Sequence, residues 1–161
     1  MEIALFFVFG LAGGSFLNAL LWRLETGRVI TVFTGRSECV HCRHRLGFWD
    51  LVPVLSFIFL KGRCRYCFKK INRQYPWVEI VSAAGFALIY FYSSNIFDAI
   101  FLSGMFLVTF SIFIYDLKFF IIPDSLILVG LTWLVLWKIL FFRDEWINYF
   151  LAGGVIFSFF F

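Results

Sequence analysis

The chain has 161 residues, of which 62% are hydrophobic, 23% aromatic and 15% charged, and 25 of them are Phe. A soluble domain is roughly 45–50% apolar and about 25% charged, so this composition excludes a soluble globular domain, a disordered chain and a disulfide-rich secreted module. Long uncharged segments and a mean hydropathy of +0.91 predict an all-α, polytopic transmembrane protein.

Positive charge is concentrated in one loop. Between Arg23 and Arg73 eleven basic residues stand against three acidic ones (net +8), whereas the rest of the chain has three basic and seven acidic residues (net −4). Because an excess of Lys and Arg marks cytoplasmic loops, we expect this loop in the cytoplasm and the N-terminus outside. We expect these basic residues to interact with the anionic headgroups of the lipid bilayer. The sequence contains no recognisable nucleic-acid-binding module.

The first expected span covers about residues 3–22, which carry no charge and are long enough to cross a bilayer. Glu2 precedes it in place of a basic segment, so a cleaved signal peptide is not expected. Gly10-x-x-x-Gly14 within it is typical of close helix packing, and Asn18 is expected to bond a neighbouring helix. We assign residues 1–22 to the first transmembrane helix and residues 23–76 to the basic loop.

Inside the loop, the apolar stretch 48–60 is interrupted by Asp50 and Pro53. It is too short to cross the membrane, so we expect it to lie against the membrane interface or to form the middle of a metal-held unit. A crossing would also place the two cysteine pairs of the loop on opposite sides of the membrane.

Four further spans are expected in residues 77–161. They cover about residues 77–92, 96–115 and 126–142, and a last one begins near residue 146. Pro76 suits the first turn of the first of these helices, where its missing N–H costs nothing. The last span is still apolar at Phe161 and has no basic flank, so we expect a truncated chain. No internal repeat is expected.

The four cysteines form two C-x-x-C pairs in the loop, Cys39-Val-His-Cys42 and Cys64-Arg-Tyr-Cys67. Disulfides are rare in the cytoplasm, and two such turns can close into a tetrahedral four-sulfur site suited to structural Zn²⁺. A thiol–disulfide relay and ordinary reduced cysteines are the alternatives. His41 and His44 are expected outside the ligand set, because four cysteines complete it.

Carboxylates occur where the second of these four spans ends and the third begins, in the segment from Asp116 to Pro123-Asp124. An ionisable group at the edge of a span is a functional candidate. The alternative is that Asp116 flanks one helix and Asp124 caps the next. Eight helical residues rise about 12 Å, whereas paired catalytic carboxylates lie near 3 Å apart, so the sequence offers Asp116 no evident partner.

Four motifs carry a family resemblance. Gly14-Ser-Phe-Leu-Asn18 with Arg23-Leu24, the paired C-x-x-C loop, Arg73-Gln-Tyr-Pro-Trp-Val-Glu79, and Asp116-x₆-Pro123-Asp124 follow one another along the chain. In this order they resemble the N-terminal portion of bacterial type IV prepilin peptidases, which are bifunctional leader peptidase/N-methyltransferases.

The resemblance implies a membrane aspartic protease of the Gly-x-Gly-Asp type, in which Asp116 is one catalytic aspartate and Asp124 and Glu79 are supporting residues. The second aspartate would lie in a downstream Gly-x-Gly-Asp motif, which these 161 residues do not contain. The chain alone is therefore expected to be inactive as a protease.

The resemblance further implies the substrates, the cofactor and the location. The intact enzyme would cleave the leader peptide of prepilins or pseudopilins at the cytoplasmic face of the bacterial inner membrane, for pilus assembly and type II secretion. It would then methylate the new N-terminus with S-adenosyl-L-methionine, at a site that the sequence does not locate. Two other functions stay open, a non-catalytic zinc-binding membrane assembly module and a membrane thiol oxidoreductase.

Overall fold

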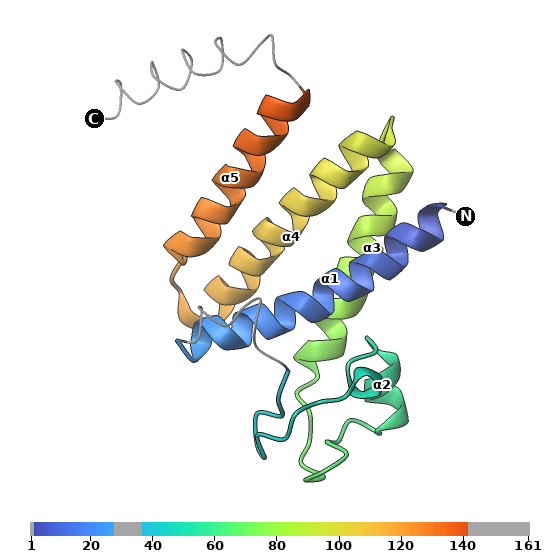
Figure 1. Ribbon diagram of the computed structural model, residues 1–161, viewed down its shortest axis with the longest axis vertical. Coiled ribbons are helices and arrows are strands. Elements are labelled where there is room, and N and C mark those ends of the chain that lie inside the picture. The colour runs from blue at the N-terminus through green and yellow to red at the C-terminus, as the bar shows by residue number, and fades with distance from the viewer. Residues whose placement is uncertain (1, 28–36, 142–161) are drawn as a thin grey trace. The chain divides into compact units, whose positions relative to one another are not determined.

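The computed structural model describes residues 2–27 and 37–141 and is helical (Figure 1). These ranges contain no strand, only two isolated antiparallel bridges, Glu38 to Arg45 and Arg63 to Lys70. The predicted all-α class is confirmed, while the span expected from about residue 146 lies outside the described residues. The helices are α1 (Glu2–Glu25), the short 3-10 helix η2 (Phe48–Asp50), α2 (Leu55–Phe59), α3 (Gln74–Tyr92), α4 (Ile96–Phe119) and α5 (Asp124–Phe141).

Three helices of the described chain are long and apolar enough to cross a membrane. They are α1, α4 and α5, with mean hydropathies of 1.9, 2.0 and 1.8. Helix α3 is not among them, and polar residues such as Gln74 and Glu79 lower its mean hydropathy. A transmembrane α3 therefore stays a prediction.

Helices α1 and α3 pack with their backbones in contact at Gly10 and Gly14. A Cβ atom on Gly10 would lie 2.6 Å from the Cα of Ala83, and one on Gly14 would lie 2.7 Å from the Cα of Glu79. Such distances are too short for any side chain, so Gly10-x-x-x-Gly14 is a packing surface, as predicted.

A hydrogen bond fastens the same two helices where α3 begins. The buried Asn18 side chain donates from Nδ2 to the Tyr75 carbonyl oxygen at 3.0 Å. The predicted bond from Asn18 to a neighbouring helix is confirmed. It places the first turn of α3 beside the last part of α1.

A small aromatic core holds α1, α3 and the first part of α4 together. Phe6, Phe86 and Ala99 are buried in it, and Phe106 of α4 packs edge-on against Phe86 with ring centroids 6.4 Å apart. At Gly85 of α3 an added Cβ would lie 2.5 Å from the Phe106 ring. The absence of a side chain at Gly85 thus makes room for that ring.

The chain forms two compact units, one up to Ser111 and the other from Ile112, and the division falls within α4. Helix α4 ends at Phe119 and not near Tyr115 as expected, so Asp116 belongs to its last turn. There Phe120, with a φ of 53°, donates its N–H to the Asp116 carbonyl at 2.8 Å. This left-handed residue ends the helix.

The α1–α3 contact predicts unequal effects for two neighbouring glycines. Gly14→Ala should lower the free energy of unfolding by about 1–3 kcal/mol, because its methyl group meets the α3 backbone. Gly13→Ala is the matched control, since its Cβ would meet only the end of the Leu107 side chain, at 3.2 Å. Thermal unfolding of the detergent-solubilised chain measures both, and equal melting temperatures for the two variants would contradict this packing.

Candidate functional site

The first C-x-x-C pair lies in a tight knuckle closed by three backbone hydrogen bonds. Cys39 donates its N–H to the His44 carbonyl at 2.9 Å, and Arg43 donates back to the Cys39 carbonyl at 2.9 Å. At its base, Leu46 donates its N–H to the Ser37 carbonyl, with 2.8 Å between nitrogen and oxygen. The sulfurs of Cys39 and Cys42 are thereby held on one turn.

The second knuckle repeats the first. Cys64 donates to the Lys69 carbonyl at 2.9 Å, Phe68 donates to the Cys64 carbonyl at 3.0 Å, and Ile71 donates to the Gly62 carbonyl at 2.9 Å. Each bond has its equivalent in the first knuckle, so the expectation of no internal repeat was wrong. The signal was present in the sequence, where Cys39-Val-His-Cys-Arg-His-Arg-Leu46 matches Cys64-Arg-Tyr-Cys-Phe-Lys-Lys-Ile71 in both cysteines, in one basic position (Arg45 and Lys70) and in the final aliphatic residue.

Both knuckles also share a left-handed residue directly after the second cysteine. Arg43 has a φ of 57° and Phe68 a φ of 56°. This conformation costs a non-glycine residue free energy, and here it turns each N–H back towards the carbonyl of the first cysteine. The backbone thus holds the two cysteines of each knuckle on one turn.

The two knuckles bring all four thiols together. Their sulfur atoms lie within 4.8 Å of one another, and those of Cys39 and Cys67 are 3.9 Å apart. Tetrahedral Zn²⁺ with bonds of about 2.3 Å requires sulfurs about 3.8 Å apart. Cys39 and Cys64 are buried, Cys42 is exposed, and none of the four is in a disulfide. The donor set therefore fits a closed four-thiolate site.

The two histidines of the loop lie outside this cluster. The His44 ring packs against the Tyr66 ring with centroids 3.7 Å apart, so it joins one knuckle to the other. The metal-ligand cluster found in the described ranges consists of cysteines alone.

Hydrogen bonds shift the pKa values of two thiols in opposite directions. Burial would raise the pKa of Cys39, but the N–H groups of Cys42 and His41 donate to its sulfur and the pKa falls to about 7. At Cys67 the N–H of Lys69 favours the thiolate, while burial and the neighbouring thiols outweigh it and raise the pKa to about 11. The remaining protons would leave as a metal ion binds.

Asp50 connects η2 to the second knuckle. Its Oδ2 accepts the Gly47 N–H at 3.1 Å, and its Oδ1 lies 2.8 Å from Nε of Arg65, between the cysteines of that knuckle. The Asp50 side chain is only 6% exposed, so this ion pair is better shielded from water than an ordinary surface pair. It ties the apolar stretch to the cysteine cluster.

Glu79 holds the other end of that stretch. Val54 has a φ of 60° and a ψ of −48°, and Leu55 donates its N–H to the Pro53 carbonyl. This is a γ-turn of the strained type, and a β-branched residue rarely adopts it. The buried Glu79 carboxylate accepts the Val54 N–H at 2.8 Å and also a hydrogen bond from Ser15 of α1. Glu79 therefore links the loop to both packed helices.

Asp116 and Asp124 lie in the second unit, at the end of α4 and the start of α5, and both are exposed. In the part of the chain that the structure describes, neither carboxyl group is found in a hydrogen bond or an ion pair. Asp124 is placed where its negative charge faces the positive end of the α5 dipole. Asp116 and Asp124 thus belong to the second unit, whereas the cysteine cluster and Glu79 belong to the first.

Comparison with known proteins gives one family. Residues 8–93 match the model of the bacterial peptidase A24 N-terminal domain. A prepilin leader peptidase/N-methyltransferase of Vibrio cholerae is 31% identical over 130 residues, covering 77% of this chain and 51% of that protein. One of the same name from Bacillus subtilis is 31% identical over 148 residues, covering 89% and 57%. The chain thus spans about half the length of these relatives, and no solved structure matches it.

The cysteine cluster predicts one Zn²⁺ per chain. Replacing Cys64 and Cys67 together by Ser should remove most of the metal, because two ligands cannot complete a tetrahedral shell. His41→Ala is the matched control and should keep it. Metal analysis of the purified protein decides, and full zinc retention in the double cysteine variant would eliminate the four-thiolate site.

The Glu79–Val54 contact predicts that the carboxylate protects one amide. In Glu79→Ala, exchange of the Val54 N–H for deuterium should accelerate at least tenfold, because a bond to a charged acceptor is lost. Glu79→Gln keeps an acceptor oxygen and should retain most of the protection. Unchanged exchange at Val54 in Glu79→Ala would show that the loop is held elsewhere.

Proposed function

The chain belongs to the bacterial type IV prepilin peptidase family, and from this premise we propose that it serves in cleaving the leader peptide of prepilins and methylating the new N-terminus. The observation that carries the proposal is the family match over residues 8–93, a range that includes the four-thiol cluster. The relatives from Vibrio cholerae and Bacillus subtilis bear both activities in their names.

Asp116 is the catalytic carboxylate in this proposal. Leader cleavage by an aspartic protease needs a water molecule between two carboxyl groups, one ionised to take a proton and the other protonated to give one. Exposure of Asp116 at the end of α4 leaves it accessible to a second carboxylate and to a peptide. The partner aspartate would come from a Gly-x-Gly-Asp motif outside these 161 residues.

Asp124 and Glu79 are positioning residues in the same proposal. Asp124 starts α5 and stabilises the turn that follows Asp116. Glu79 holds the γ-turn of the loop against α3. Neither needs to touch the reacting peptide bond for its role.

The zinc site is structural. Four thiolates fill the coordination shell and leave no open position, which a catalytic zinc would need. The convergence of both C-x-x-C turns on one point also favours metal binding over a thiol oxidoreductase, in which one cysteine pair suffices. A membrane assembly module without catalysis is the alternative that remains, and the cleavage experiment below tests it.

S-adenosyl-L-methionine would supply the methyl group for the second reaction. The open groove found beside the second knuckle does not suit it, since Lys61, Arg63 and Arg65 line that groove and would repel a sulfonium cation.

The three apolar helices support a multi-pass protein of the inner membrane. We propose that the cysteine loop faces the cytoplasm and that α1 begins outside, because the basic residues gather in the loop after α1. Prepilins or pseudopilins would reach the site from the cytoplasmic side, and pilus assembly and type II secretion would use the products.

The cleavage proposal predicts a requirement for two carboxylates. These 161 residues alone should not process a co-expressed prepilin, whereas adding the C-terminal portion of a full-length relative, fused or as a separate fragment, should restore the size shift. In the restored enzyme Asp116→Asn should lower the rate at least about 100-fold, because an amide neither ionises nor relays a proton.

Asp124→Asn is the matched control for that variant. It loses only a favourable charge at a helix N-terminus, about 0.3–1 kcal/mol, and the rate should fall by less than about fivefold. Processing by the unsupplemented chain, or by restored enzyme carrying Asp116→Asn, would overturn the assignment. A failure of every supplemented chain to process prepilin would favour the assembly module.

A further inference from the structure

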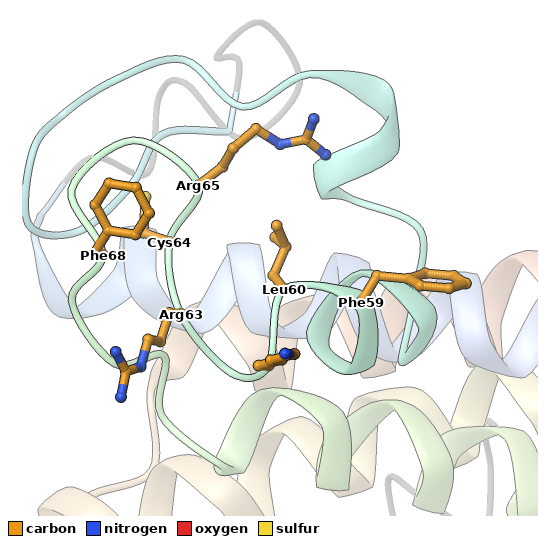
Figure 2. Close-up of a pocket in the computed structure, with 7 residues that line it drawn as sticks. Phe59, Leu60, Arg63, Cys64, Arg65 and Phe68 are labelled. Atoms are coloured by element: carbon orange, nitrogen blue, oxygen red, sulfur yellow. The ribbon is translucent and has the colours of Figure 1, made fainter.

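An open groove of about 560 Å³ lies where α2 meets the second knuckle (Figure 2). It combines aromatic or aliphatic side chains with cations. In Figure 2 Phe59 and Phe68 stand on opposite sides of Leu60. Its lining includes Phe59, Leu60, Lys61, Arg63, Arg65 and Phe68.

Two of the three cations that line this groove are not paired with a carboxylate in the part of the chain that the structure describes. Arg65 pairs with Asp50, but within residues 2–27 and 37–141 no carboxylate is found paired with Lys61 or Arg63. Two neighbouring positive charges therefore favour an anionic occupant.

The aromatic side chains of the lining are exposed. Phe59 is 80% exposed and Phe68 is 71% exposed, although both are large aromatic residues that normally seek cover. An anion alone would leave them in water. The occupant must therefore offer an apolar portion next to its negative charge.

The groove is held close to the membrane-spanning part of the chain. Val54, directly before α2, is bonded to Glu79 of α3, and only residues 71–73 separate the Lys70 bridge from the start of α3. At about 3.5 Å per residue this tether is at most roughly 14 Å long. Asn18 fastens that start of α3 to the apolar helix α1, so the bilayer is the nearest surface of suitable chemistry.

We propose that this groove docks on the bilayer by binding an anionic phospholipid. The phosphate lies between Lys61 and Arg63, and Phe59 and Phe68 enter the boundary between headgroups and acyl chains, where aromatic side chains are favoured. Two basic residues near an anionic surface together strengthen such binding roughly 30-fold. The zinc knuckle thereby lies flat against the membrane beside α3.

Hydrogen–deuterium exchange of the zinc-loaded chain in nanodiscs tests the proposal. The amides of Lys61, Gly62 and Arg63 should exchange at least fivefold more slowly in phosphatidylcholine discs that contain phosphatidylglycerol than in discs of phosphatidylcholine alone. High salt should remove the difference, because the attraction is electrostatic. Equal exchange in both lipids would overturn the proposal without needing any variant.

Two matched double variants locate the effect. Lys61→Gln with Arg63→Gln should abolish the response to phosphatidylglycerol, whereas Lys69→Gln with Lys70→Gln should keep it. The control pair changes the same charge on the same exposed knuckle but does not line the groove. An equal loss in both pairs would show general attraction of the loop and would overturn a defined site.

Two additions to phosphatidylcholine discs separate other anions from lipid. Protection by soluble glycerol phosphate would identify a site for free phosphate, and protection by an acidic peptide but not by phosphatidylglycerol would identify a protein partner. Either result would overturn the lipid assignment. No protection by either addition, together with protection by phosphatidylglycerol, is the expected result.

Discussion

Helices α1 and α3 approach so closely at Gly10 and Gly14 that no side chain fits between them, and the position of the loop depends on this contact. Glu79 lies on the α3 surface that touches Gly14, and its carboxylate holds Val54. The strained γ-turn of Val54 is affordable only because this acceptor is fixed in place. The packing of α1 against α3 thus fixes Glu79, and Glu79 in turn fixes the conformation of the loop at Val54.

Two side-chain contacts and the cysteine cluster between them organise the loop. Asp50 ties η2 to Arg65 of the second knuckle, while Glu79 ties the start of α2 to the helices. Between them the repeated knuckles present four sulfurs to one point. A metal ion bound there would stabilise a segment whose own apolar side chains are largely exposed, because it would replace the hydrophobic core that so short a segment cannot build.

Catalysis, as proposed, draws on a different part of the chain from the metal. Asp116 belongs to the unit that begins at Ile112, whereas the cysteines and Glu79 belong to the unit that ends at Ser111. A structural zinc need not approach the scissile bond, because its role is to order the loop.

The sequence by itself determined the helical class, the four-cysteine site and the packing role of Gly10 and Gly14, because composition and spacing along the chain express these directly. The knuckle repeat was readable there too, but only as a pattern of two cysteines, one basic position and one aliphatic position. Tertiary structure alone decided that Glu79 meets Val54 and that Phe59 and Phe68 share a groove with Lys61. Both depend on left-handed turns at non-glycine positions, which local sequence preferences disfavour.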